Sequence, residues 1–172
     1  MSPPERPLDP ISEAHRQWVA HDLPAPLAMT AVISIVRAEQ LVTTAVDRAL
    51  RPLDLTFARY EVLMLLKFSR RGALPITTMG GRLMIHPTGI TKLIDKLEQR
   101  GLVRREPNPL DRRGTLARIT PVGRRLATRA SKTVGDISFG LDLDAGRLQE
   151  IIDVMQLVRT RHDPHAATRS QP

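Results

Sequence analysis

The spacing of apolar residues predicts that most of this chain is helical. Residues 27–51 contain neither proline nor glycine, and their apolar side chains form two stripes on different sides of a helix. The stripes consist of Met29, Val32, Ile33 and Val36, and of Ile35, Val42, Val46 and Ala49. A helix that is apolar on more than one side must be covered on more than one side. We therefore expect a second subunit to cover part of it.

Capping residues, prolines and glycines mark the ends of further helices. Ser and Thr cap helix N-termini, proline fits the first helical position, and glycine ends helices. Beside 27–51, the predicted helices run from Ser12 to His21 in an N-terminal extension (1–26), over 57–68 after the cap Thr56, from Thr77 or Thr78 to Met84, from His86-Pro87 to Arg100 before Gly101, from Thr120-Pro121 to near Gly135, and from Asp142 or Asp144 towards residue 160. We expect residues 161–172 to form a disordered tail.

Two short strands are predicted within this helical chain. They cover 102–106 and 115–119, and a loop over 107–114 joins them. Leu74-Pro75-Ile76 is a further extended piece, in which proline excludes a central strand. Helix, turn, helix and hairpin follow one another as in a winged helix-turn-helix. We predict a mostly α fold with a minor β part: a winged helix-turn-helix over 55–120 with dimerisation helices over 27–51 and 120–160.

The helix over 86–100 has a buried face and a polar face. Ile90, Leu93, Ile94 and Leu97 fall within an arc of about 100°. Short hydroxyls and cations lie opposite, together with one acid: Thr88, Thr91, Lys92, Asp95 and Gln99, with Lys96 beside them. Such groups can donate hydrogen bonds to phosphates and to base edges in a major groove. Any surface helix has polar residues outward, so the interpretation as a DNA-binding helix rests on its neighbours. These are the preceding short helix, in which Gly80 allows close packing of the two helices, and the following hairpin.

The hairpin is rich in arginine. Arg112 and Arg113 lie at its tip, and Arg104, Arg105 and Arg118 lie on its strands. A guanidinium on a narrow ribbon can enter a minor groove, where the negative potential is strongest. Asp111 would be repelled by phosphate, so we expect it to hold an arginine in place. The alternative is an ordinary polar hairpin.

Charge and composition narrow the class of protein. Residues 82–132 contain 13 Lys and Arg against 4 Asp and Glu, whereas the rest of the chain has a net charge of −1. This segregation favours a polyanionic partner. The chain has no cysteine, which excludes disulfides and thiolate chemistry. The N-terminus does not resemble a signal peptide, and the uncharged stretch 23–36 is too short to span a bilayer. We expect a cytoplasmic protein that does not bind membranes.

The segment TTMGGRLMIHPTGITKLIDKLEQRGLVRREPNPLDRRGTLARITPVGRRL resembles the MarR family of bacterial regulators. Its most specific parts are ITKLIDKLEQRGLVRR, the D-x-R of Asp111 and Arg113, and ARITPVG. The resemblance extends over roughly residues 27–160. It implies a homodimer that binds a pseudo-palindromic operator in double-stranded DNA, as a ligand-responsive repressor. The implied DNA-binding residues are Thr78, Pro87, Thr88, Thr91, Lys92, Lys96, Arg105, Asp111, Arg112 and Arg113.

The resemblance also implies a small aromatic or anionic effector, and no cofactor. The predicted effector-binding residues are Trp18, Arg37, Phe57, Tyr60 and Met64, and plain core packing is the alternative for the aromatic ones. The additional helix bearing Trp18 is similar to that of the urate-responsive branch. We expect no metal site, because His162 and His165 fall in the predicted tail.

Three other functions fit the sequence less well. An enzyme is disfavoured because no phosphate-binding glycine loop, G-x-S-x-G or H-E-x-x-H occurs, and no catalytic residue is predicted. A winged helix used for protein interaction would be expected to lose the positive charge that Lys92 and Lys96 retain. An RNA-binding module generally presents stacking aromatics, which the basic segment lacks.

Overall fold

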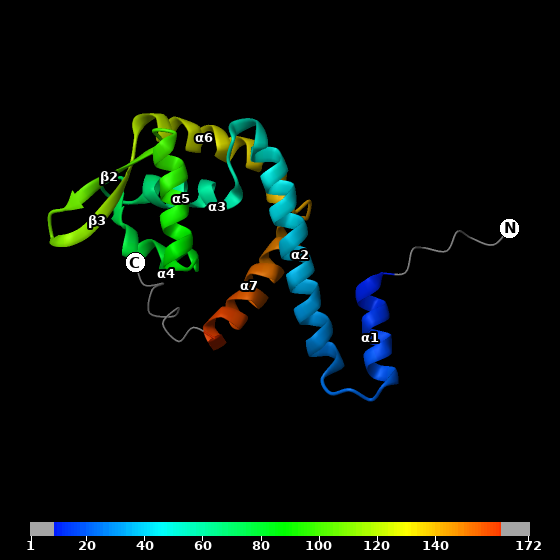
Figure 1. The fold of residues 1–172 in the computed structure, drawn as a ribbon. Helices are drawn as coiled ribbons and strands as arrows, with labels where there is room; N and C mark the ends of the chain where they lie inside the picture. The colour runs from blue at the N-terminus through cyan, green and yellow to red at the C-terminus, as the bar shows by residue number, and fades with distance from the viewer. Residues whose placement is uncertain (1–8, 163–172) are drawn as a thin grey trace. The chain divides into compact units, whose positions relative to one another are not determined.

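A computed structural model describes residues 9–162 of the chain, apart from the side chains of Arg112 and Arg113. The structure divides into two compact units after Gly140. The first unit contains helices α1 (Pro10–Ala20), α2 (Pro26–Leu50), α3 (Phe57–Phe68), α4 (Ile76–Leu83), α5 (Pro87–Gln99) and α6 (Pro121–Gly135), 3-10 turns η1 (Arg51–Leu53) and η2 (Ser138–Gly140), and strands β1 (Ala73–Pro75), β2 (Val103–Asn108) and β3 (Asp111–Ile119). The second unit contains α7 (Ala145–His162). The predicted mostly α winged fold is confirmed (Figure 1).

Local sequence explains several helix ends. The Thr56 hydroxyl accepts a hydrogen bond from the Arg59 N–H, and the Thr120 hydroxyl accepts one from the Gly123 N–H, as predicted. Gly101 adopts a left-handed conformation after α5 with φ of +66°. Of the two candidates for the α7 cap, Asp144 is the one whose carboxylate accepts a hydrogen bond from the Arg147 N–H. The predicted tail begins too early, since α7 continues to His162; its remainder lies outside the described residues.

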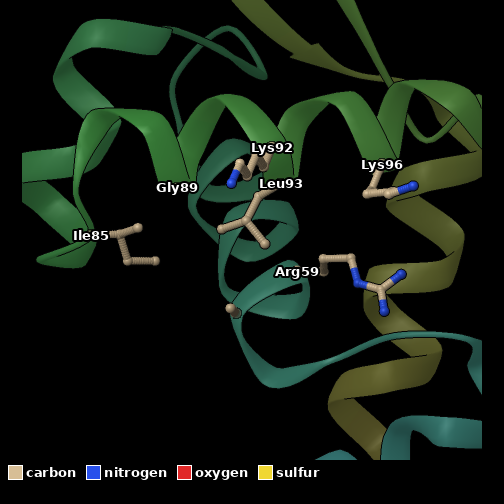
Figure 2. A pocket seen from close by; sticks show the side chains of 7 residues that line it. Arg59, Ile85, Gly89, Lys92, Leu93 and Lys96 are labelled. Carbon is tan, nitrogen blue, oxygen red and sulfur yellow. The ribbon is translucent and has the colours of Figure 1, made fainter.

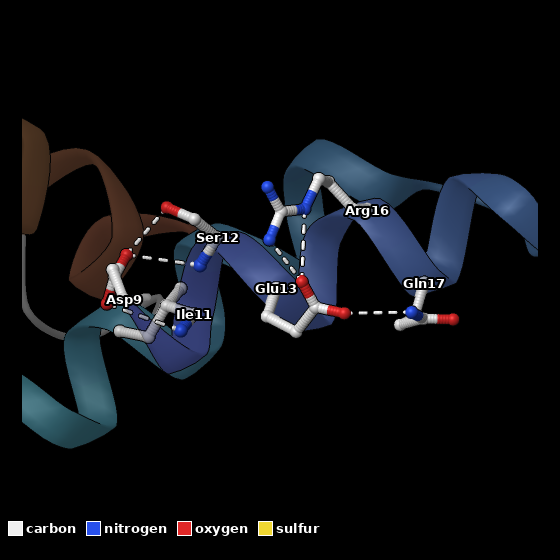
Figure 3. A network of polar contacts seen from close by, with 6 residues as sticks. All are labelled: Asp9, Ile11, Ser12, Glu13, Arg16 and Gln17. Atoms are coloured by element: carbon white, nitrogen blue, oxygen red, sulfur yellow. Dashed lines mark hydrogen bonds and ion pairs between the residues drawn. The ribbon is translucent and has the colours of Figure 1, made fainter. Parts of the chain in front are cut away.

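Two predicted caps are wrong. Asp9, rather than Ser12, caps α1, and its carboxylate accepts hydrogen bonds from the N–H groups of Ile11 and Ser12 (Figure 3). The cause is Pro10, which starts the helix two residues earlier than expected. Helix α4 has no side-chain cap, and the Thr78 hydroxyl instead donates to the carbonyl oxygen of Pro75 at 2.9 Å.

The hairpin is longer than predicted. Pairing of β2 with β3 continues to Asn108 and Asp111, so that only residues 109–110 remain as the loop. The three antiparallel strands have the order β1-β3-β2, which makes β2 an edge strand. An edge strand tolerates Pro107, because a proline there removes no ladder hydrogen bond. The same holds for Pro75 in β1, at the other edge.

The core lies in the part of the first unit that we call the winged lobe, residues 46–134. Among the described residues, every buried apolar side chain falls within it. Helix α5 contributes Ile90, Ile94 and Leu97, as the helical pattern predicted, whereas Leu93 of the same predicted stripe is only half-buried. Gly80 permits a close approach, because a Cβ there would lie 2.8 Å from the carbonyl oxygen of Ile85. At Gly81 a Cβ would meet nothing within 4 Å, and the structure does not explain this glycine.

Helices α1 and α2 pack along each other outside this core (Figure 1). The ring of His15 in α1 forms a hydrogen bond with the Thr30 hydroxyl of α2 at 2.8 Å. Apolar side chains nevertheless remain exposed on α2, including Leu27, Val32, Ile35, Val36 and Leu41. By length and composition alone, the helical run Pro26–Leu53 could cross a membrane. The expectation of no membrane span rested only on the shorter uncharged stretch 23–36.

Candidate nucleic-acid interface

The turn between α4 and α5 sets the start of the second helix. Met84 ends α4 in a left-handed conformation, with φ of +54°, and the Ile85 N–H donates to the carbonyl oxygen of Gly80. His86 then caps α5, where its Nδ1 accepts a hydrogen bond from the Thr88 N–H at 3.4 Å. Pro87 occupies the first turn, where its missing N–H has no cost. This arrangement leaves the N-terminus of α5 at the surface.

The structure brings the predicted residues of α4 and α5 to the surface. Thr78 of α4 is exposed, and so are five residues of α5: Pro87, Thr88, Thr91, Lys92 and Lys96. The Thr91 hydroxyl donates to the carbonyl oxygen of Pro87 at 3.2 Å and thereby keeps its oxygen available as an acceptor. Across the described part of the chain, neither Lys92 nor Lys96 forms an ion pair. Two ammonium groups one helical turn apart are therefore available to bind an anion.

A groove separates α5 from α3 beneath these lysines. Figure 2 shows Lys92, Leu93 and Lys96 on the side of α5 that faces Arg59 of α3. The groove has a volume of about 610 Å³ and an apolar floor that includes Ile85 and Leu93. Arg59 is held in place by hydrogen bonds from its guanidinium to the Thr56 hydroxyl and to the carbonyl oxygen of Asp54. Arg59 of α3 thus extends the cationic surface formed by Lys92 and Lys96 of α5 across the groove.

The strand arginines are paired with acids. Arg104 and Arg118 each bind the Glu106 carboxylate at 2.7 Å, and Arg118 also donates to the carbonyl oxygen of Arg71. The hydrogen bond from Arg118 is the largest cause that lowers the pKa of Glu106. Glu106 therefore stays ionised and joins the two arginines across the hairpin.

Arg105 reaches from β2 to α5. Its guanidinium binds Asp95 at 2.6 Å and also binds Glu98. Burial alone would lower the pKa of Arg105, but the hydrogen bonds that it donates to both carboxylates raise it overall. The sequence placed Asp95 on the outward face of α5 and did not predict these pairs. The acids at 95 and 98, one helical turn apart and opposite a basic strand, are the signal that could have indicated them.

The tip of the wing is described only in part. Arg112 and Arg113 lie at the start of β3, and their side chains fall outside what the structure describes. Asp111 is exposed, and its carboxylate lies over Gly114, where a Cβ would be 2.8 Å from the carboxylate oxygen Oδ2. The predicted minor-groove contact and the predicted orienting role of Asp111 both stay predictions.

Three of the five predicted effector residues lie together. The rings of Phe57 and Tyr60 stack with centroids 6.3 Å apart, and the Ser131 hydroxyl contacts both the Tyr60 hydroxyl and the Met64 sulfur. Phe139, which the sequence did not suggest, lies against Tyr60 at 6.4 Å. This cluster forms part of the first unit between α3, α6 and η2.

The other two predicted effector residues lie elsewhere. The indole N–H of Trp18 donates to the carbonyl oxygen of Pro24, and Arg37 donates to Gln40. Asp47 marks the part of α2 beside the cluster, because it accepts a hydrogen bond from the Phe57 N–H. Arg37 precedes Asp47 by ten residues, which is about 15 Å along a helix. The structure therefore does not bring Trp18 or Arg37 to the aromatic cluster of the same chain. No group of three or more potential metal ligands occurs among the described residues, and His165 lies outside them.

Known proteins resemble this chain in both sequence and structure. The family model described as MarR family matches residues 55–115. The multiple antibiotic resistance protein MarR of Escherichia coli is 33% identical over 110 residues, which cover 60% of this chain and 74% of that protein. Among six curated relatives, the chain spans between 52% and 74% of the relative's own length.

Two solved structures from Streptomyces coelicolor share the fold. Sco5413, a MarR family transcriptional regulator, is 41% identical with a TM-score of 0.75, and the match covers 84% of this chain and 98% of that one. Sco3205, a MarR family transcriptional regulator solved in complex with DNA, is 26% identical with a TM-score of 0.69. That match covers 80% of this chain and 89% of Sco3205.

Proposed function

Because this chain belongs to the MarR family of transcriptional regulators, we propose that α5 and the β2–β3 wing bind operator DNA. The observation that carries the proposal is the exposed face of α5, where Lys92 and Lys96 have no acidic partner in the described chain and lie next to threonine hydroxyls. A second helix of a helix-turn-helix enters the major groove with its N-terminal residues towards the bases. The start of α5 is exposed, as this docking requires.

Apart from Arg105, each predicted DNA-binding residue has a proposed role in this contact. Thr88, Thr91 and Lys92 lie nearest the N-terminus of α5 and contact base edges or the adjacent phosphates. Lys96, one turn later, contacts the backbone. Pro87 lies in the first turn of α5 and Thr78 in the first turn of α4, and both contact the adjacent phosphate backbone. Arg113 and Arg112 of the wing enter the flanking minor groove, with Asp111 orienting Arg113.

The protein acts as a homodimer in this proposal. The exposed apolar side chains of α2 need cover, and α7, taken by itself, also carries exposed apolar residues such as Ile152 and Leu157. The C-terminal half of α2 enters the winged lobe through Val46 and Leu50, which favours a protein partner over a membrane for the rest of the helix. A two-fold dimer presents two copies of α5 to an operator with matching symmetry.

An effector would act on the aromatic cluster at α3. Phe57 and Met64 are half-buried beside the buried ring of Tyr60, and such an apolar cluster would suit the aromatic part of a small effector, while a cation for an anionic group would have to come from elsewhere. Trp18 and Arg37 could complete such a site only if they came from a partner subunit. Loss of operator affinity on effector binding makes the protein a ligand-responsive repressor, acting in the cytoplasm where its DNA is.

Fluorescence anisotropy tests the DNA-binding proposal. The full chain is titrated with labelled genomic duplex fragments and with the separated strands at several salt concentrations. We expect preference for duplex, and a salt slope that falls by about one in Lys92→Ala. Lys132→Ala is the matched control, because Lys132 is exposed in the same basic segment but lies on α6. The proposed interface would be contradicted if the protein bound single strands as tightly as duplex, or if Lys92→Ala and Lys132→Ala lost the same amount of duplex affinity.

A further inference from the structure

Arg105 is bound by two carboxylates of the recognition helix. Its Nη2 donates to Asp95 Oδ1 at 2.6 Å, its Nη1 donates to Glu98, and its backbone N–H donates to Glu98 Oε1 at 2.8 Å. Its side chain is 29% exposed. The backbone N–H and two guanidinium donors of one strand residue are therefore committed to α5, and the charge of the guanidinium is already shared between two carboxylates.

These pairs change the charge that α5 presents. Asp95 lies between Lys92 and Lys96 in the sequence, and Glu98 follows them, so residues 92–98 of the helix alone have no net charge. The Arg105 guanidinium adds one positive charge to this surface and takes up hydrogen-bonding capacity of both acids. Without it, two carboxylates would face a polyanion from the helix that must approach the DNA most closely.

Arg105 also joins two elements that the other arginines do not join. Arg104 and Arg118 bind Glu106 within the hairpin, and Arg100 at the end of α5 donates to the carbonyl oxygens of Leu53 and Asp54. Among the described side chains, Arg105 makes the ion pairs that connect the wing to α5. The wing and the helix must meet neighbouring grooves together, so their relative orientation matters for DNA binding.

We infer that Arg105 is a positioning residue and does not contact DNA. It neutralises Asp95 and Glu98 and joins the wing to the recognition helix. This inference rests on the proposed DNA-binding function and gives Arg105 another role than the groove contact predicted from the sequence.

Removing the acids together with the arginine tests this role. Arg105→Gln should weaken duplex affinity roughly tenfold or more, because both carboxylates lose their partner and face the phosphates. The triple variant Asp95→Asn, Glu98→Gln, Arg105→Gln should bind within about threefold of the unchanged protein, since no acid remains to repel the DNA and amide side chains at all three positions can still hydrogen-bond β2 to α5. Arg16→Gln is the matched control, because Arg16 pairs with Glu13 on α1, away from the wing (Figure 3).

The alternative role predicts a different pattern. If Arg105 contacted a phosphate, Arg105→Gln and the triple variant would be weakened equally, and the salt slope would fall by about one in both. Either that pattern or undiminished binding by Arg105→Gln would overturn the inference. If the unchanged protein did not bind duplex DNA, the proposed function would fail in the same titration.

Hydrogen exchange gives a readout that needs no DNA. The Arg105 amide, which donates to Glu98 Oε1, should exchange slowly in the free protein and faster in Glu98→Ala. Unchanged exchange in Glu98→Ala would contradict the positioning role, whatever the DNA titrations show. Thermal unfolding of each variant checks that the fold is retained.

Discussion

In the winged lobe, most apolar side chains are buried by the lobe's own elements, whereas similar side chains in α1 and in the part of α2 before Val46 mostly face outward. Leu63 and Ile94 have no exposed surface, while Leu27 and Leu41 are 77% and 72% exposed. No residue of α1 is buried, and α2 is buried only at Val46 and Leu50. The two regions do not differ in the kind of residue, so the difference lies in what covers them.

This contrast indicates which region can be stable alone. The winged lobe has a contiguous core that holds α3, α4, α5, α6 and the sheet together. The part of α2 before Val46 keeps apolar surface that would stabilise an interface by about 1.5–3 kcal/mol for each large side chain buried. We expect the stability of the flanking helices to depend on protein concentration, as that of an obligate dimer does.

The largest expected effect comes from placing charge on the exposed apolar face of α2. The double variant Val32→Asp, Leu41→Asp should be monomeric and should lose operator affinity roughly a hundredfold, because two carboxylates cannot be buried unpaired and one half-site is lost. Sedimentation and anisotropy measure the two effects. Phe68→Asp is the control in the winged lobe, since Phe68 is 76% exposed. If both variants stayed dimeric, α2 would not be the dimer interface.

Two glycines of α4 sharpen the comparison within the winged lobe. Gly80→Ala should lower the free energy of unfolding by about 1–3 kcal/mol, because its Cβ would lie against a backbone carbonyl. Gly81→Ala should raise it by up to about 1 kcal/mol, because the site is open and alanine favours the helix. Urea unfolding measures both values. Equal effects of the two substitutions would mean that α4 and the turn after it are not tightly packed.

A smaller effect is expected at the wing. Arg113→Ala should weaken binding to all duplex sequences alike and lower the salt slope by about one, as a single lost phosphate contact would. Lys92→Ala should in addition alter base preference, because it lies near the start of α5. Affinities for a panel of operator variants separate the two cases. An unchanged salt slope in Arg113→Ala would remove the wing from the interface.

The smallest effect concerns a half-buried carboxyl in α3. Burial raises the pKa of Glu61, so the folded state favours the protonated form. Its contribution to stability is therefore present below the unfolded pKa and is lost as the pH rises towards the folded pKa. Glu61→Gln should raise the Tm slightly at pH 7 and leave it nearly unchanged at pH 4. A lower Tm at pH 7 would show that the carboxylate has a favourable partner.

The sequence predicted what depends on neighbouring residues. Thr56 and Thr120 cap their helices, and the buried stripe of α5 follows the helical period, because these features need only a few adjacent positions. The bounds of the hairpin were missed, since strand pairing is decided by both strands together. The functional class came from a family resemblance rather than from the physical pattern alone.

The candidate site was less predictable, because its contacts join distant segments. Arg105 meets Asp95 and Glu98 only when β2 lies along α5, and a helical wheel places Asp95 outward. Phe139 reaches Tyr60 from far along the chain, so no local pattern suggests it. Trp18, at the other extreme, is grouped with that cluster only through the family resemblance, although it lies on α1.

Selection of bound fragments from a random duplex library, with the purified full chain, tests the central claim most directly. Two copies of α5 related by a two-fold axis should enrich an inverted repeat with half-site centres about 10 base pairs apart. The Lys92→Ala, Lys96→Ala variant should enrich no such repeat. Enrichment of a sequence without two-fold symmetry, or of none, by the unchanged protein would contradict DNA recognition by a dimer through this surface.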